Sequence, residues 1–332
     1  MIPPYLKSKA VFYFIAPSFG CTTSPYQERL TKTCEELPKK GHTILLGPNC
    51  FSAQGKCASN DAEKRAKEFM DAYQSQADVI VSVGGGEMET EILDYIDFKT
   101  IRKLPPKWFV GFSDNTHLTF TLTTLADVAT IYGPCAGNYH FKTFSYDVKD
   151  AYDMLYGKLD FEGYPFYESV PDRTDPLADY KLDTKKVIVP FQYSAPFSGC
   201  LIGGNLDCLV QLVGTPFDQM KAYQRKHPEG LIFYFEACDL SVVGIKRALL
   251  QLKRAGWFTN VNGFLSGRPL CMDQEFLGIT DQNAVTDVLK DLNVPILLNV
   301  DLGHLSPSMP MKNGVEAMVC LEQGNIKIHY KA

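Results

Sequence analysis

The sequence predicts an α/β protein in which an N-terminal doubly wound, mostly parallel sheet domain is followed by a second, C-terminal α/β domain. Short apolar runs alternate with longer amphipathic segments over the first 135 residues, as in a parallel sheet with helices on both faces. The alternation stops after about residue 140 and resumes near residue 196. We therefore expect an N-terminal domain over 1–140, a linker with an irregular loop over 141–195, and a C-terminal domain over 196–332.

The individual elements follow from the period of the apolar residues and from the turn residues between them. In the first domain we expect strands at 11–15, 42–46, 78–83, 108–112 and 130–132, and helices at 25–37, 61–74, 88–95 and 115–126. Further on we expect helices at 148–156, 242–254 and 281–291, a short helix ending at 212, and strands at 197–202, 231–235, 261–265, 294–299, 315–321 and 326–330. Ligand sites in parallel sheets lie at the carboxyl ends of the strands, where the turn segments Ala16–Ser18, Gly84–Gly86 and Gly111–Ser113 converge.

Composition excludes several classes of function. The net charge of −5 over 332 residues provides no basic field for nucleic acid or for an anionic membrane surface. No apolar run approaches the roughly 20 residues that span a bilayer. The ten cysteines are scattered without a C-x-x-C pair, which favours reduced thiols in a cytoplasmic protein and indicates neither a disulfide framework nor a zinc site. We expect no metal and no cofactor.

The most informative segment is Trp108–Thr116, where an apolar run ends in a Gly-Phe-Ser turn and a helix-compatible segment follows. A strand that turns sharply into a helix at a serine exposes the hydroxyl and leaves backbone N–H groups beside it. Ser113 is therefore the expected nucleophile for acyl transfer. The alternative is a helix N-cap, which serine often provides. Asn115 departs from the full G-x-S-x-G pattern, so the motif is matched only in part.

The glycine run Gly84–Gly86 ends the neighbouring strand. We expect the N–H groups of Asp114 and of Gly85 or Gly86 to form an oxyanion hole beside Ser113. A phosphate cradle is the alternative, but the acidic residues at 87, 89 and 91 repel a polyphosphate. We interpret these acidic residues as a solvated first helical turn, where the helix dipole favours them.

A serine nucleophile requires a base and an orienting carboxylate elsewhere in the chain. His304 is the expected base because it lies where an apolar strand ends in a Gly/Pro-rich loop, and His117 is the alternative one helical turn after the nucleophile. Glu236 is the expected orienting acid, since a carboxylate directly after five apolar residues is costly to bury unpaired. Asp301 is a second candidate for that role.

In their order and spacing these segments resemble the LD-carboxypeptidases (muramoyl-tetrapeptide carboxypeptidases) and the related microcin C self-immunity peptidases. The resemblance covers most of the chain and rests on Ala16–Ser18, Gly84–Glu87, Gly111–Asp114, Gly203–Leu206, Phe235-Glu236, and Gly303-His304 with Pro307. In the sequence, Ser113 precedes Glu236 by 123 positions, and Glu236 precedes His304 by 68. The resemblance implies a Ser113–Glu236–His304 triad carried by two α/β domains, and a homodimer.

The substrate class follows from the resemblance. It implies a metal-independent serine carboxypeptidase that releases terminal D-alanine from a cytoplasmic murein tetrapeptide, with Ser18 and Asn205 as candidates for holding the substrate carboxylate. The first alternative is an immunity peptidase acting on a peptidyl- or aminoacyl-nucleotide. Leu240 stands where that branch carries a substrate-contacting lysine, whereas the long 140–195 segment is typical of it. The second alternative, from another class, is a non-catalytic ligand-binding protein.

Overall fold

The computed structural model describes residues 1–170 and 175–331 and divides into two compact units. Among the described residues, the first unit comprises 1–158, 175–180 and 310–312, and the second comprises 159–170, 181–309 and 313–331. Within the described chain, no helix is both long and apolar enough to cross a membrane.

The first unit is a six-stranded sheet in the order β16-β5-β4-β3-β1-β2, in which β1 to β5 are joined by parallel pairing. Its strands are β1 (Val11–Ile15), β2 (Thr43–Leu46), β3 (Val79–Ser82), β4 (Trp108–Gly111), β5 (Thr130–Tyr132) and β16 (Met311–Asn313). Every residue of β3 and β4 is buried, as expected for central parallel strands covered on both faces. This confirms the predicted doubly wound parallel sheet.

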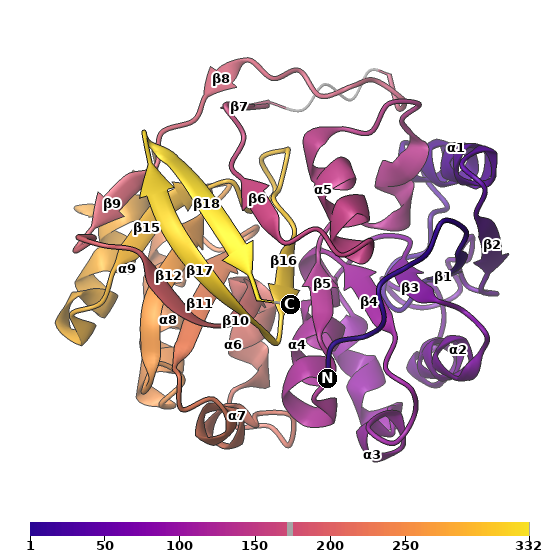
Figure 1. The fold of residues 1–332 in the computed structure, drawn as a ribbon, viewed down its shortest axis with the longest axis horizontal. Helices are drawn as coiled ribbons and strands as arrows, with labels where there is room; N and C mark the ends of the chain where they lie inside the picture. The colour runs from indigo at the N-terminus through magenta and orange to yellow at the C-terminus, as the bar shows by residue number, and fades with distance from the viewer. Residues whose placement is uncertain (171–174, 332) are drawn as a thin grey trace. The chain divides into compact units, whose positions relative to one another are not determined.

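Helices cover both faces of this sheet. Figure 1 shows α1 and α5 on one side, and α2, α3 and α4 on the other. The helices are α1 (Tyr26–Lys39), α2 (Ala62–Gln74), α3 (Phe98–Ile101), α4 (Thr116–Ala126) and α5 (Tyr146–Leu155), with 3₁₀ turns η1 (Glu89–Tyr95), η2 (Ser113–Asn115) and η3 (Ala136–His140). The carboxyl ends of the adjacent strands β1, β3 and β4 carry the three predicted turn segments, which therefore lie together.

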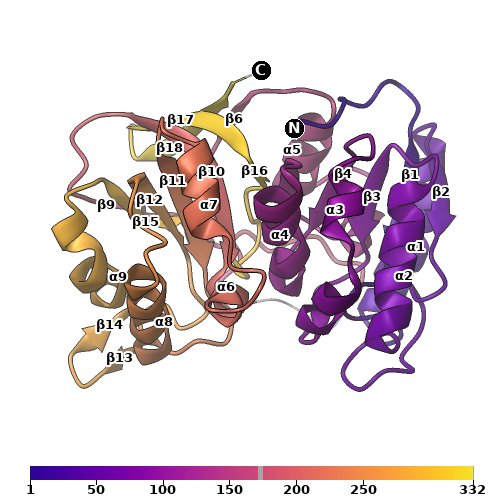
Figure 2. The same cartoon turned by 90° about the horizontal axis from the view of Figure 1, so that it is seen from below.

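The second unit contains an eight-stranded mixed sheet in the order β6-β18-β17-β10-β11-β12-β15-β9. Its parallel centre is β10 (Phe197–Asn205), β11 (Leu231–Glu236), β12 (Val261–Gly267) and β15 (Ile296–Val300), and antiparallel strands flank it: β6 (Asp160–Glu162), β9 (Val189–Phe191), β17 (Val315–Glu322) and β18 (Asn325–Tyr330). The helices are α6 (Leu206–Leu212), α7 (Met220–Lys226), α8 (Val242–Arg254) and α9 (Asp281–Leu289), followed by the 3₁₀ turn η4 (Lys290–Leu292). Figure 2 shows α8 beside α9, with the small hairpin β13 (Glu275–Phe276) and β14 (Ile279–Thr280) at their ends.

The segment predicted as a linker is divided between the two units. Its helix α5 belongs to the first unit, whereas β6 and β9 extend the sheet of the second, and the two-residue strands β7 (Phe166–Tyr167) and β8 (Thr184–Lys185) pair with each other. The division of the chain therefore differs from the predicted boundaries at 140 and 195. Short edge strands of two or three residues carry too few side chains to show a period of two.

Candidate active site

Ser113 lies at a sharp strand-to-helix turn. It follows β4 and has a φ of +63°, a conformation that costs a residue with a Cβ roughly 1–2 kcal/mol. Neither η2 nor α4 has a side-chain cap, so the alternative of a helix-capping serine is not what the structure shows. A strained serine between a strand and a helix is the geometry of a nucleophile elbow.

The turn is held by two residues that sequence reasoning did not assign. The Ser113 backbone N–H donates to the Tyr132 hydroxyl at 3.0 Å. The Asn115 amide donates to the carbonyls of Gly84 and Phe112, at 2.9 Å each, and so ties the glycine turn to the elbow. Asn115 stands at the position where the motif departs from glycine, and that departure was the available signal for its role.

Beneath the elbow, the carboxylate of Asp114 is buried and accepts several hydrogen bonds. One oxygen accepts from the Ser18 hydroxyl and from the Glu89 backbone N–H at 2.8 Å, and the other lies 3.1 Å from His117 Nδ1. Burial pushes the pKa of Asp114 upward, but His117, Ser18 and the Glu89 N–H outweigh burial and lower it. The carboxylate therefore stays charged. Its hydrogen bonds hold Asp114, the residue directly after Ser113, in place.

The structure bears on three further expectations about this region. Glu89 is fully buried, not part of a solvated acidic turn, and burial together with Asp114 raises its pKa well above the usual range. His117, the alternative base, is also fully buried. Its Nδ1 contacts the carbonyl and the carboxylate of Asp114, so His117 helps to hold the residue that follows Ser113. The buried hydroxyl of Ser18 is bound to Asp114, and its role in holding substrate stays a prediction.

The glycine turn lies directly beside the nucleophile. A Cβ added at Gly85 would be 3.0 Å from Ser113 Cβ and 3.4 Å from its hydroxyl oxygen. At Gly86, whose φ is +148°, a Cβ would be 2.3 Å from the Ser18 hydroxyl oxygen. Only glycine allows this close approach, and it leaves the peptide groups of the turn next to Ser113. The oxyanion hole of Asp114 with Gly85 or Gly86 stays a prediction that this proximity supports.

The backbone strain at Ser113 gives a testable prediction. Replacing Ser113 with Gly should raise the free energy of unfolding by about 0.5–1 kcal/mol, because relief of the steric cost of the positive φ exceeds the extra conformational entropy that glycine loses on folding. Ser113→Ala is the matched control, since it also lacks the hydroxyl but keeps the Cβ. Urea unfolding of the three proteins measures the difference, and a Gly variant less stable than the Ala variant contradicts a strained elbow.

In the second unit, Glu236 and His304 lie in direct contact. Glu236 ends β11 and is buried, and its Oε2 is 2.9 Å from His304 Nδ1. The other carboxylate oxygen accepts a 2.9 Å hydrogen bond from the Asn205 side chain, whose own Oδ1 accepts from the Cys208 N–H at 3.2 Å and so caps α6. Asn205 thus holds Glu236, and its predicted contact with substrate stays a prediction.

The environment of His304 favours its charged form. Burial lowers its pKa, but the charge of Glu236 and hydrogen bonds to Cys238 and Glu236 outweigh burial and raise the pKa well above the usual range. Cys238 was not singled out from the sequence. Asp301, the second candidate for the orienting carboxylate, is instead paired with Arg268 and Lys186 at 2.7 Å each.

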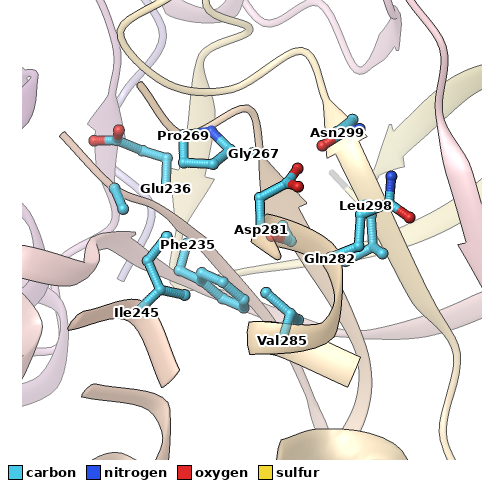
Figure 3. Close-up of a pocket in the computed structure, with 12 residues that line it drawn as sticks. Phe235, Glu236, Ile245, Gly267, Pro269, Asp281, Gln282, Val285, Leu298 and Asn299 are labelled. Atoms are coloured by element: carbon cyan, nitrogen blue, oxygen red, sulfur yellow. The ribbon is translucent and has the colours of Figure 1, made fainter. Parts of the chain in front are cut away.

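A small pocket lies behind Glu236, at the carboxyl ends of β11, β12 and β15. Asp281 and Gln282, at the start of α9, form one wall. In Figure 3 the carboxylate of Glu236 points away from Asp281. The carboxylate is directed instead toward Asn205 and His304, with which it makes its hydrogen bonds.

Comparison with known proteins places this fold and these residues in a family. Residues 13–133 match the LD-carboxypeptidase N-terminal domain, and residues 198–319 match the LD-carboxypeptidase C-terminal domain. Together these matches span most of the chain. The chain belongs to the LD-carboxypeptidase family, known as peptidase S66.

Relatives of both expected branches are similar to this chain. It is 26% identical to a Bacillus subtilis protein named "Probable murein peptide carboxypeptidase" over 91% of this chain and 86% of that one. It is 24% identical to the microcin C7 self-immunity protein MccF of Escherichia coli, over 91% and 88%. Among solved structures, an MccF-like protein from Bacillus anthracis shares the fold with a TM-score of 0.84 at 21% identity, covering 100% of both chains.

Proposed function

We propose that the protein is a metal-independent serine carboxypeptidase in which Ser113, His304 and Glu236 act as one triad. The observation that carries the proposal is the Glu236–His304 contact at 2.9 Å, in a chain of the LD-carboxypeptidase family whose own Ser113 lies on a strained elbow. A buried carboxylate on Nδ1 fixes the imidazole tautomer that leaves Nε2 free of a proton. That is the form in which a histidine accepts the proton of a serine hydroxyl.

The proposed reaction has two halves. Ser113 Oγ attacks the scissile carbonyl while His304 takes its proton, and the oxyanion is held by the N–H groups of Asp114 and of Gly85 or Gly86. His304 then returns the proton to the leaving amine. In the second half, water attacks the acyl-enzyme, again with His304 as base, and Ser113 is released.

The substrate that we propose is a cytoplasmic murein tetrapeptide, from which hydrolysis of the L,D amide bond releases terminal D-alanine. The support is the murein-peptide relative and the length of chain over which the similarity extends. A homodimer, without cofactor, metal or nucleic acid, remains our expectation from the family resemblance.

A second candidate substrate is an aminoacyl-nucleotide. It is favoured by the similarity to MccF, one of whose structures is a complex with aspartyl sulfamoyl adenosine and has a TM-score of 0.83 to this chain at 20% identity, covering 100% of this chain and 99% of that one. A ligand-binding protein without turnover is the remaining alternative, in which neither substrate is hydrolysed.

A direct comparison of substrates separates these candidates. We expect mass spectrometry to detect release of D-alanine from synthetic tetrapeptides ending in D-alanine, and no release from the same peptides ending in L-alanine. Aspartyl sulfamoyl adenosine serves as the competing substrate in parallel reactions. Faster cleavage of the nucleotide conjugate supports the immunity-type activity, and stable binding of either compound without cleavage contradicts the hydrolase.

A further inference from the structure

The loop that carries His304 is closed on itself and pressed against the end of β12. Within this loop, 301–309, the Met309 N–H donates to the Asp301 carbonyl at 2.6 Å. At Gly303, φ is +120°, and an added Cβ would be 2.6 Å from the Arg268 carbonyl oxygen. At Gly267, which is labelled in Figure 3, a Cβ would be 2.9 Å from Glu236 Cβ. The backbone of the loop 301–309 and the backbone at the end of β12 therefore both lie next to the Glu236 side chain.

The guanidinium of Arg268 binds this loop on both sides of His304. Its Nη1 donates to Asp301 Oδ1 at 2.7 Å, before the histidine, and its Nη2 donates to the carbonyls of Leu305 and Pro307 at 3.3 and 3.4 Å, after it. Arg268 is buried, with a relative exposure of 1% for the whole residue. A buried cation of this kind persists only when it is paired and hydrogen-bonded.

The segment that precedes β9 binds the same cluster from its other side. The Tyr167 ring stacks on the guanidinium of Arg268 at 4.5 Å. Lys186 Nζ and the Tyr164 N–H bind the second oxygen of Asp301, at 2.7 and 3.0 Å, and the Glu168 N–H donates to the Ser306 carbonyl at 2.8 Å. Described residues of the predicted linker segment 141–195 therefore hold the His304 loop, 301–309, in place within the second unit.

We propose that Arg268 is a positioning residue that, through Asp301 and the loop carbonyls, keeps the His304 imidazole on Glu236. The inference rests on the proposed function, in which His304 is the base. Catalytic groups must be held within about 0.5 Å of their productive geometry by such supporting contacts. The planar fork of arginine reaches the carboxylate and the carbonyls together, whereas a lysine supplies one point charge and cannot span both sides of the loop.

The test compares Arg268→Lys with Arg254→Lys, a matched change at an exposed arginine in the last turn of α8. The titration of His304 is followed by NMR in protein with isotope-labelled histidine, and its signal is identified by its absence in His304→Gln. The ionisable groups that bear on His304 are Glu236 and Cys238. We expect the pKa of His304 to fall by about one unit or more in Arg268→Lys, because a loosened loop weakens the contact with Glu236. It should not change in Arg254→Lys.

Kinetics provide the second readout. In Arg268→Lys we expect kcat to fall at least about tenfold with KM changed less than about threefold, as for a residue that acts on the base and not on substrate binding. A folded Arg268→Lys protein with the wild-type His304 titration and wild-type kcat overturns the proposal, even if its stability is reduced.

Two further features keep the test decisive. Tyr167→Ala removes the stack on Arg268 without leaving a buried charge unpaired, so it reports on the cluster if the arginine variants do not fold, and the same but smaller shift at His304 is expected. An unshifted titration in this variant then overturns the proposal.

The NMR measurement needs no turnover. If the wild-type protein hydrolyses no substrate, the proposed function fails while the positioning of His304 by Arg268 is still decided.

Discussion

Ser113→Ala is expected to lower kcat by about 10⁴- to 10⁶-fold on whichever substrate the wild-type protein cleaves, because removal of the nucleophile leaves only binding and the oxyanion donors. Its fold should be unchanged, since the positive φ of Ser113 and the bond of its N–H to Tyr132 do not involve the hydroxyl. The measurement is single-turnover and steady-state hydrolysis, with the far-UV circular dichroism spectrum as a check on folding.

The control for this variant is Ser8→Ala, a serine-to-alanine change at an exposed position of the same unit. It should keep wild-type kcat and KM. Retained turnover in Ser113→Ala, within about tenfold of wild type, would be far above the residual rate that a serine hydrolase keeps without its nucleophile. That result excludes Ser113 as the attacking group, and the strained turn at Ser113 would then have only a structural role.

Glu236→Gln should produce the second largest effect. Loss of the carboxylate is expected to lower kcat by about 10²- to 10⁴-fold, because the amide neither stabilises the imidazolium nor enforces its tautomer. It should also change the pH profile. Glu236 raises the pKa of His304, and the base works in its neutral form, so the acidic limb of the wild-type kcat/KM profile lies above pH 6.5, the unperturbed value. In the variant this limb moves to lower pH.

The matched control is Asp239→Asn, which removes an exposed carboxylate three residues further along the chain. Its pH profile should follow that of the wild-type protein. If the acidic limb of the kcat/KM profile does not move in Glu236→Gln while kcat falls, Glu236 does not set the pKa of His304. Its carboxylate then contributes to activity by maintaining the fold.

The central sheet strands and the elbow could be predicted from the sequence because their signals are local. The strand 11–15 and the helix 242–254 were predicted with the bounds that the structure shows. Both have a clear period and clear turn residues at their ends. By contrast, β16 (Met311–Asn313) has three residues and joins the sheet beside β5, which ends far earlier in the chain at Tyr132, and no local pattern indicates this pairing.

The residues that support the candidate site were harder to predict than the proposed reactive groups, whose roles stay predictions. Ser18 and Asn205 are predicted from the sequence as candidates for holding the substrate carboxylate, but nothing local showed that Asp114 and Glu236 bind them. Arg268 was missed because a charged residue is expected at the surface, and its burial depends on Asp301, which lies 33 residues away in the sequence. The available signal was its position directly after a buried strand.

The claim that Ser113 and His304 form one catalytic centre is tested most directly by the kcat/KM values of Ser113→Ala, His304→Ala and the double variant. Substitutions of residues that act as a unit have strongly non-additive effects on kcat/KM. The kcat/KM of the double variant should therefore be within about threefold of that of the less active single variant. Losses that multiply in the double variant, or a His304→Ala protein with near wild-type turnover, would contradict the account.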